Sequence, residues 1–360
     1  MLDERPAVSV VIPARDAAEH LPDALGSLGR QGPGGSDLGD DLEVVVVDDG
    51  SVDDTDDVLA EAGAHLRRLS VVRHSVPRGV SAARNHGVRR SSGAWVTFLD
   101  PDDWFFPGHL AAMLRAAGRL AGPLPADGED RADRANGEDG ARGANGEDGA
   151  GGAGVDFLVC DQVQSRGTER TMVRAPEPRR HMPLDPRTGI LPTSRTTMVN
   201  YVQVSSRFVS RAAVDAGLAR FDESLPTAED REWAWRLLLG ARSYAVVDAP
   251  GYVYRRQVAG SLTDIGDARQ LGFLDAYGAV LDGLRAAGRA ELEPKALRDA
   301  LVVLHHHVQR RATYPDDVWR AMVAGAGALL DRFDDDVVAA QVAALGPDRV
   351  HALRRQGVHL

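Results

Sequence analysis

The sequence is poor in cysteine, in lysine and in long apolar runs. Cys160 is the only cysteine among 360 residues, which excludes an intrachain disulfide and a zinc site built from cysteines, and suits a reducing compartment. No run approaches the roughly 18 apolar residues of a membrane span, and the first ten residues lack the basic start and apolar stretch of a signal peptide. Lys295 is the only lysine, so arginine carries nearly all of the positive charge. We therefore expect a soluble, cytoplasmic protein.

The sequence also lacks an excess of positive charge. Its formal net charge is -11, whereas a nucleic-acid-binding protein would carry a basic stripe. Residues 127–148 contain eight acidic and three basic side chains, so this segment holds nearly half of the net negative charge. The rest of the chain is only mildly acidic, and we expect no nucleic-acid partner.

Large apolar side chains are almost absent from residues 122–154. The sequence ANGEDGA occurs there twice, nine residues apart, which is too short and too polar a repeat for a solenoid. Such a segment cannot bury enough surface to offset its chain entropy. We predict a disordered insert at 122–154 within a first domain that spans 1–256, followed by a helical region at 257–360.

Elsewhere, short apolar runs alternate with helical patterns. Runs of Val and Ile without polar alternation are typical of strands buried on both faces of a parallel sheet. The predicted strands are 7–13, 42–50, 69–74, 94–100, 155–163, 198–210 and 243–256. The predicted helices are 17–31, 52–63, 79–93, 211–217 and 227–240, and helical spacing continues from 267 to the end with breaks at Pro294, Pro315 and Pro347. The expected fold class is α/β, a mostly parallel sheet flanked by helices.

Two adjacent aspartates, Asp48 and Asp49, end the apolar run LEVVVVDD. In an open parallel sheet, ligands bind beyond the carboxyl ends of the strands. A dinucleotide-binding domain is one alternative, but the Gly-rich turn that it needs after its first strand is missing from VVIPARDAAEH. Helix capping is another alternative, and it explains Ser51 and Asp53 better than the paired aspartates.

Two arginines flank the start of the next predicted helix, in PRGVSAARNHG. Arg78 and Arg84 are six residues apart and would point to opposite sides of one helix, so they can share an anion only if Arg78 lies on the preceding loop. Arginine forks and free amides near a helix N-terminus suit phosphate oxygens. The alternative is that both arginines cover solvent or pair with the aspartates.

Three carboxylates, Asp100, Asp102 and Asp103, follow the predicted strand at 94–100. Like charges this close raise one another's pKa and reduce stability unless a cation offsets them. An Asp-x-Asp pair at a strand end offers hard oxygen ligands to Mg²⁺ or Mn²⁺, with positions left for water and a substrate diphosphate. The sequence therefore predicts a divalent-metal site at this turn.

Five segments, in their order along the chain, resemble the family-2 glycosyltransferases with the GT-A fold. They are VSVVIPARD, VVVVDDGSVDDT, GVSAARNHG, WVTFLDPDDW and TAEDREWAWRL, and the resemblance covers residues 7–256 outside the insert. It implies a GT-A fold and an inverting transfer of a sugar from a nucleotide-diphosphate sugar to an acceptor hydroxyl. It also implies Mn²⁺ or Mg²⁺ as the cofactor.

The same resemblance implies roles for individual residues. Asp230 matches the catalytic base, with Glu229 beside it to orient it or contact the acceptor, and Asp102 and Asp100 match the metal-binding motif. A base on the far side of the sugar suits inversion, because it takes the proton of the attacking hydroxyl. The donor-binding positions are Pro13, Ala14, Arg15, Asp16, Asp49, Arg78, Arg84, Asn85, Asp100, Asp103, Arg256 and Ser261.

The chain departs from the family pattern at the end of its first motif. Relatives commonly have an aromatic residue and Asn where this sequence has Arg15 and Asp16. A guanidinium plane can still stack on a nucleobase. The donor base is thus expected to be held by different contacts here.

Two other functions stay open from the sequence. A sugar nucleotidyltransferase would show a Gly-rich, basic signature after its first strand, and PARDAAEH is neither. A non-catalytic nucleotide-sugar-binding relative would have no chemical reason to keep Asp100, Asp102 and Asp230 together. The acceptor is open among polysaccharide, lipid-linked, protein and small-molecule hydroxyls. The helical region is a candidate for contact with the acceptor, the membrane periphery or a second copy of the chain.

Overall fold

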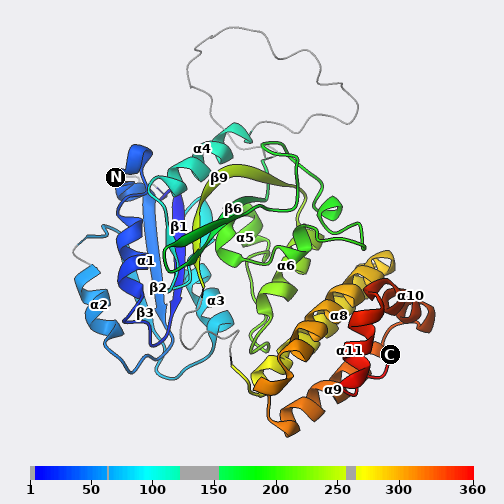
Figure 1. Ribbon diagram of the computed structural model, residues 1–360. Coiled ribbons are helices and arrows are strands. Elements are labelled where there is room, and N and C mark those ends of the chain that lie inside the picture. The colour runs from blue at the N-terminus through cyan, green and yellow to red at the C-terminus, as the bar shows by residue number, and fades with distance from the viewer. Residues whose placement is uncertain (1–4, 63–64, 122–153, 257–264) are drawn as a thin grey trace, which may run out of the picture.

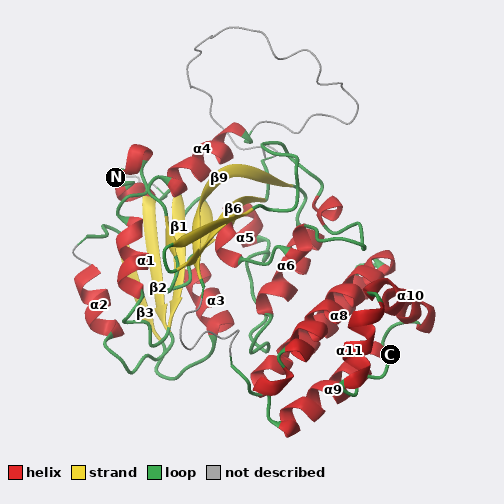
Figure 2. Ribbon diagram, in the orientation of Figure 1, coloured by secondary structure: helices red, strands yellow, loops and turns green. Residues whose placement is uncertain are grey.

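The computed structural model describes residues 5–62, 65–121, 154–256 and 265–360, whose arrangement Figure 1 shows. Within them, a nine-stranded sheet has the order β3-β2-β1-β4-β8-β6-β9-β5, with β7 paired to β6. Helices lie on both faces of the sheet, and a bundle of helices follows it (Figure 2). The predicted insert, up to residue 153, and Ser261 lie outside the described residues.

The first four strands form a parallel group. They are β1 (Val8–Ala14), β2 (Leu42–Asp48), β3 (Leu69–Arg73) and β4 (Trp95–Phe98). β1 pairs in parallel with β2 and β4, and β2 pairs in parallel with β3. Every residue of β1 is buried, as expected for a strand with helices on both faces. The strands predicted from the Val-rich runs are confirmed.

Helices follow each of these strands. They are α1 (Leu21–Leu28), α2 (Thr55–Ala62), α3 (Val80–Arg90) and α4 (His109–Arg119). A Cβ added at Gly87 of α3 would lie 2.3 Å from Cγ1 of Val11 in β1, so glycine allows this close approach of helix and sheet. Because α1, α2 and α3 each follow a strand, their first turns lie at the carboxyl edge of the parallel strands.

The second half of the sheet is mixed. Its strands are β5 (Trp104–Phe105), β6 (Phe157–Arg166), β7 (Glu169–Val173), β8 (Arg207–Ser210) and β9 (Tyr244–Arg255). β8 runs antiparallel to β4 and to β6, whereas β9 runs parallel to β6 and antiparallel to β5. The antiparallel start of β8 therefore lies at the same edge as the carboxyl end of β4.

Only the last four residues of the strand predicted at 198–210 form one, β8. The residues before them include two short 3-10 turns, Met198–Asn200 and Val204–Ser206. The amide of Thr197 donates to Oδ1 of Asn200 at 3.0 Å. Local side-chain hydrogen bonds of this kind offer the backbone an alternative to strand pairing.

A hydrophobic core lies between the sheet and α6 (Glu229–Gly240). Trp233 and Trp235 of this helix are 0% and 1% exposed and lie in this core. Cys160 of β6 is fully buried. The short helix α5 (Arg211–Asp215) precedes α6 along the chain.

The C-terminal region is a helical bundle with its own core. Its helices are α7 (Gly272–Ala286), α8 (Glu293–Gln309), α9 (Asp316–Leu330), α10 (Asp335–Leu345) and α11 (Pro347–Arg355). The three predicted breaks, at prolines 294, 315 and 347, fall at helix starts, where no amide is needed. In the described part of the chain, no helix is both long and apolar enough to cross a bilayer.

The only lysine connects this bundle to the segment that precedes β8. Lys295 of α8 is 1% exposed, and its Nζ donates to the carbonyl of Arg195 at 3.0 Å and to Oδ1 of Asn200 at 2.8 Å. It also forms an ion pair with Asp299 at 3.2 Å. Burial lowers the pKa of Lys295, and Asp299 opposes that shift. The two parts of the chain therefore share a buried polar contact.

Candidate active site

The predicted site residues gather at the carboxyl edge of the parallel strands. The end of β1 and its loop hold residues 13–16, the loop after β2 holds 48–55, and the turn after β4 holds 100–103. Ligands of open α/β sheets bind beyond this edge. The first turn of α6, residues 229–230, reaches the same edge, where Arg84 bonds to both segments.

The loops after β1 and β2 are braced against each other. The amide of Asp16 donates to Oγ of Ser51 at 2.9 Å, and Oδ1 of Asp16 accepts from the amide of Val52 at 2.9 Å. The amide of Ala17 donates to Oγ1 of Thr55 at 3.0 Å. Asp16 has a φ of 47°, which is uncommon for a residue with a side chain. The predicted donor residue Asp16 is thus a structural tie between the two loops.

The neighbours of Asp16 differ in exposure. Pro13 and Ala14 are buried at the end of β1. The side chain of Arg15 is 56% exposed, and its Nε lies 3.7 Å from the carboxylate of Asp16. Of these predicted donor residues, Arg15 offers the accessible side chain.

Asp49 fixes the loop that precedes α3. Its carboxylate, 4% exposed, accepts from the backbone amides of Arg78 and Gly79, each at 2.8 Å. Nδ1 of His74 lies 2.7 Å from the same carboxylate, and Nε2 of His74 lies 3.0 Å from Nδ1 of His86. The structure therefore places Asp49 as a buried anchor with its oxygens already bonded.

Arg78 lies on the loop before α3, which is where it would have to lie to share an anion with Arg84. Arg84, however, points toward Asp100 and Glu229. The half-exposed Arg78 side chain lies 3.6 Å from the carboxylate of Glu223. Asn85 is buried: its Oδ1 accepts from the amide of Phe221 at 2.8 Å, and its Nδ2 donates to the Phe221 carbonyl at 2.9 Å. Asn85 thus holds the segment that leads to α6.

Arg84 bridges the Asp-x-Asp turn and the first turn of α6. It is 4% exposed, and its Nη2 donates to Oδ1 of Asp100 at 2.9 Å while its Nη1 donates to Oε1 of Glu229 at 2.8 Å. Its guanidinium carbon lies 5.1 Å from the ring centre of Phe221. Burial lowers the pKa of Arg84, but the two carboxylates outweigh it, so the pKa is raised. Two segments far apart in sequence are thereby locked together.

The other two aspartates of the turn have different surroundings. Asp103 is fully buried, and it accepts from the Tyr252 hydroxyl at 2.7 Å and the Arg255 amide at 2.8 Å. Burial, with Asp102 and Asp100, raises its pKa well above the ordinary value. Asp102 is partly exposed, and no cationic nitrogen of the described residues lies within 4 Å of its carboxylate. Burial and Asp100 raise the pKa of Asp102 to about 6.

The two acidic residues of α6 are also distinct. Glu229 is 7% exposed and paired with Arg84; burial raises its pKa, with Arg84 opposing and Asp230 adding to the shift. Asp230 is partly exposed, and its Oδ1 accepts only from the amide of Arg231, at 2.8 Å, among the described groups. Ala228, just before them, has a φ of 62°, a left-handed conformation that turns the chain into the helix. Asp230 therefore keeps lone pairs free at this edge, whereas the Glu229 carboxylate is bonded to Arg84.

Sequence patterns did not indicate Arg255, which closes the Asp-x-Asp turn from β9. Its Nε donates to the carbonyl of Asp102 at 2.8 Å and its Nη2 to Asp23 at 2.6 Å. Its guanidinium carbon lies 4.7 Å from the ring centre of Trp104. The sequence feature that could have indicated Arg255 is the pair of arginines at the end of the strand run YVYRR. The predicted residue beside it, Arg256, lies 5.6 Å from the ring centre of Tyr254.

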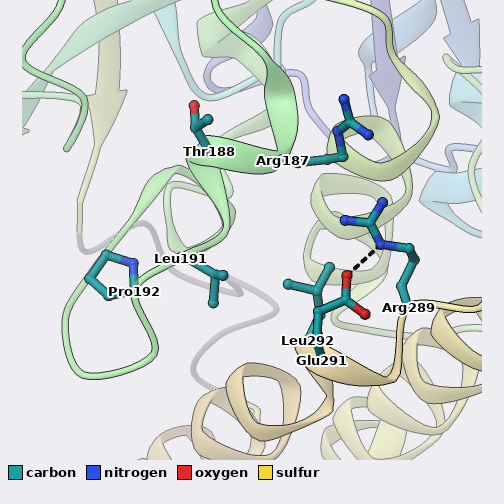
Figure 3. A pocket seen from close by; sticks show the side chains of 7 residues that line it. All are labelled: Arg187, Thr188, Leu191, Pro192, Arg289, Glu291 and Leu292. Atoms are coloured by element: carbon teal, nitrogen blue, oxygen red, sulfur yellow. Dashed lines mark hydrogen bonds and ion pairs between the residues drawn. The ribbon is translucent and has the colours of Figure 1, made fainter.

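A separate hollow of about 500 Å³ lies away from these carboxylates. Its lining residues are Arg187, Thr188, Leu191, Pro192, Arg289, Glu291 and Leu292. Figure 3 shows Arg289 turned toward Glu291, with which it pairs at 2.6 Å. None of the predicted site residues lines this hollow, so we assign it no part in the site.

Comparison with known protein families matches the N-terminal part of the chain. Residues 9–122 match the sequence model of Glycosyl transferase family 2. This segment runs from β1 to the end of α4 and includes the Asp-x-Asp turn. The family resemblance predicted from the motifs is confirmed for this segment.

Curated relatives match a limited part of the chain. It is 39% identical over 111 residues to the succinoglycan biosynthesis protein ExoU of Rhizobium meliloti, which covers 31% of this chain and 30% of ExoU. It is 39% identical over 121 residues to validoxylamine A glucosyltransferase of Streptomyces hygroscopicus subsp. jinggangensis, which covers 34% of this chain and 27% of that protein. The chain thus spans about a third of the length of the curated relatives it matches.

The fold as a whole is similar to that of a solved structure. S. aureus TarS 1-349, in its complex with UDP-GlcNAc, superimposes with a TM-score of 0.69 at 16% identity, over 98% of this chain and 88% of that chain. The similarity includes the C-terminal helices, because nearly the whole chain is covered. The predicted GT-A α/β fold with a C-terminal helical region is confirmed.

Proposed function

We propose that this protein is an inverting glycosyltransferase. Residues 1–256 form its transferase domain and 257–360 a helical region that completes it. It moves a sugar from a nucleotide-diphosphate sugar to an acceptor hydroxyl, with Mn²⁺ or Mg²⁺ at Asp102. The observation that carries the proposal is that Asp102 and Asp230 lie at one edge of the sheet, and neither forms an ion pair among the described residues. Arg84 bonds to the residues beside them, Asp100 and Glu229.

Asp102 fits a cation site that the substrate completes. Mg²⁺ and similar ions are usually held by one or two carboxylates, substrate phosphates and water rather than by an all-protein cage. The described residues contain no group of three or more His, Cys, Asp or Glu placed to hold a metal. Asp102 is the direct ligand, because Asp100 is already bonded to Arg84. A bound cation would offset the charge of the leaving diphosphate.

Asp230 acts as the base. The acceptor hydroxyl gives its proton to the Asp230 carboxylate while its oxygen forms a bond to the anomeric carbon. The bond from that carbon to the diphosphate breaks on the opposite side, and its electron pair leaves with the nucleoside diphosphate. A partly exposed carboxylate with free lone pairs suits this role. Glu229 orients the turn through its bond to Arg84.

Arg84 gives the site its fixed spacing. Its two bonds hold the Asp-x-Asp turn and the first turn of α6 at one separation, so donor and base are presented together. Arg78 and Arg15, both exposed, remain for the diphosphate and the nucleobase. Asp16, Asp49 and Asn85 shape the donor pocket by holding its loops.

Donor binding tests the proposal directly. Purified protein is titrated by calorimetry with UDP, GDP, TDP and CDP, each with and without Mn²⁺. We expect one nucleotide to bind, with Mn²⁺ required, and Asp102→Ala to remove the effect of Mn²⁺. The control is Asp40→Ala, whose side chain is 70% exposed and remote from the carboxyl edge. Binding of none of the four nucleotides would refute the assigned donor class.

The base assignment has its own test. Asp230→Asn should abolish transfer, because an amide cannot take the acceptor proton, while donor binding stays within about twofold of the parent. Polysaccharide, lipid-linked, protein and small-molecule acceptors are then screened by release of nucleoside diphosphate. Full activity of Asp230→Asn would remove Asp230 from the mechanism.

The cellular location of the protein and the contacts of its helical region are predictions. A cytoplasmic location, and contact of the helical region with the membrane periphery or a second copy, are tested by vesicle sedimentation and by analytical ultracentrifugation. Pelleting with anionic vesicles supports the membrane contact, and a mass of two chains supports a dimer.

A further inference from the structure

We propose that Thr227 is a positioning residue, whose contacts with the start of the helical region set the place of Asp230. The inference rests on the proposed function, because that function makes Asp230 the base. The family resemblance assigned no role to Thr227. This residue lies just before α6 and against the first residue of α7, so it connects the two parts of the chain next to the base.

Thr227 is bonded to the turn that leads into the helical bundle. Its half-buried side chain donates from Oγ1 to the carbonyl of Arg269 at 2.6 Å. Arg269 belongs to the 3-10 turn Ala268–Leu271, which runs directly into α7. The side chain of Asp267 caps this turn, since its Oδ1 accepts from the amide of Arg269 at 2.9 Å. The carbonyl that accepts from Thr227 is therefore held in place at the start of the bundle.

The first residue of α7 packs directly on the backbone of Thr227. A Cβ added at Gly272 would lie 2.8 Å from the carbonyl oxygen and from Oγ1 of Thr227, and 3.1 Å from its amide nitrogen. Glycine allows this close approach of two chain segments. Because most of the contact is with backbone atoms, a side chain at position 272 would displace α7 from Thr227 or Thr227 from α7.

The segment enters α6 through a constrained residue. Ala228 has a φ of 62°, a conformation that is unfavourable for a residue with a Cβ and that persists where its surroundings hold it. Ala228 packs against the hydrophobic core of the bundle. Its carbonyl accepts from the amides of Arg231 and Glu232, at 3.1 and 3.3 Å, so it forms part of the first turn of α6. A displacement of Thr227 is therefore passed on to that turn.

Asp230 depends on this backbone for its position. No cationic nitrogen of the described residues lies within 4 Å of its carboxylate, and its Oδ1 accepts from the amide of the next residue, Arg231. Arg84 holds the same turn from the side of α3, through Glu229. The turn is thus attached at two points, by Arg84 and by Thr227. Loss of either attachment lets the base move, and a displacement of about 1 Å can lower a rate by about 100-fold.

Hydrogen exchange followed by NMR tests the contact without a substrate. The amides of Arg231 and Glu232 form the first hydrogen bonds of α6 and report on this turn. Thr227→Val removes the hydroxyl at nearly constant volume, and Gly272→Ala separates the two segments. Each variant should raise the exchange rates of both amides about fivefold, as expected for the loss of about one hydrogen bond.

Two further variants are the controls for these changes. Thr227→Ser keeps the hydroxyl, so the exchange rates should stay within about twofold of the parent. Gly283 lies in the same helix, α7, with nothing within 4 Å of an added Cβ. Gly283→Ala should therefore leave the exchange of the α6 turn unchanged.

Turnover of the donor gives the second readout. The probe is the glucose ester of whichever of UDP, GDP, TDP and CDP binds in calorimetry, and release of nucleoside diphosphate is measured with water as the acceptor. Thr227→Val and Gly272→Ala should lower kcat about tenfold, while the KM for the donor stays within about twofold, because the donor contacts lie on other loops. Thr227→Ser should keep most of the parent kcat. A merely structural role would leave kcat per folded molecule unchanged, and urea unfolding supplies the folded fraction.

The outcomes separate this inference from the proposed function. Unchanged exchange of both amides in Thr227→Val and Gly272→Ala overturns the inference, and one variant decides if the other does not fold. Faster exchange with the parent kcat also overturns it, because the contact would then hold the turn without positioning the base. Full donor turnover by Asp230→Asn overturns the base assignment, whereas the exchange rates would still show whether α7 holds the turn. Faster exchange, a lowered kcat and a constant KM together support both.

Discussion

Replacing Arg84 by Met should destabilise the protein through the charges that it leaves behind. Arg84 is 4% exposed and bonds to Asp100 at 2.9 Å and to Glu229 at 2.8 Å. Met keeps much of the length and the contact with Phe221 but removes both charge-assisted hydrogen bonds. Glu229, 7% exposed, is then a buried carboxylate without a partner, and breaking a buried pair in this way costs about 3–5 kcal/mol. Urea unfolding at pH 7 should therefore show a loss of about 4 kcal/mol.

The controls isolate the buried charge as the cause. Arg269→Met breaks an exposed pair with Asp267, whose side chains are 51% and 49% exposed, and should cost less than about 1 kcal/mol. Glu229→Gln added to Arg84→Met should recover part of the loss in a double-mutant cycle. The deficit should also shrink from pH 7 to pH 5: burial raises the pKa of Glu229, so the folded variant takes up a proton before the unfolded chain does. A loss below about 1 kcal/mol, or a deficit independent of pH, would refute this reasoning.

Donor binding that depends on Mn²⁺ should weaken below about pH 6, because burial and Asp100 raise the pKa of Asp102 to about 6 and a protonated carboxyl is a poor cation ligand. Calorimetry across that range tests it, and a flat profile contradicts it. Gly87→Ala should cost about 1–3 kcal/mol in urea unfolding through its clash with β1, whereas Gly118→Ala in α4, with open space around it, should cost nothing. Stability should fall by up to about 3 kcal/mol between pH 6.5 and 4, because burial lowers the pKa of His307 to about 4 and protons then favour the unfolded chain. His307→Gln should lose less over the same range, and an equal loss would exclude His307 as the source.

Much of the fold could be predicted from local pattern. The strands of the parallel group are short Val-rich runs bounded by turn residues, and burial on both faces leaves no polar alternation in them. In the bundle, α8, α9 and α11 begin at or next to prolines, which are visible in the sequence. The segment 198–206 could not be predicted, because its apolar residues resemble a strand while its polar side chains bond locally.

Prediction of the site from the sequence was limited in a different way. Motif spacing singled out Asp102 and Asp230 as candidates, but it could not show that Glu229 is the partner of Arg84, a contact between residues 145 positions apart. Asp49 had the pattern of a ligand-binding carboxylate, yet it accepts from two backbone amides, and backbone donors leave no mark on the sequence.

The single lysine offers a chemical probe of the junction between the two parts of the chain. Amine-reactive reagents need an accessible, deprotonated amine, and Lys295 is 1% exposed with its Nζ bonded across the junction. In the folded protein such reagents should therefore modify the α-amino group alone. Modification of Lys295 requires α8 to separate from the first domain, so its rate measures the free energy of that local opening. Because the chain has no second lysine, intact-mass spectrometry can read the result directly: one adduct marks a closed junction and two mark one that has opened.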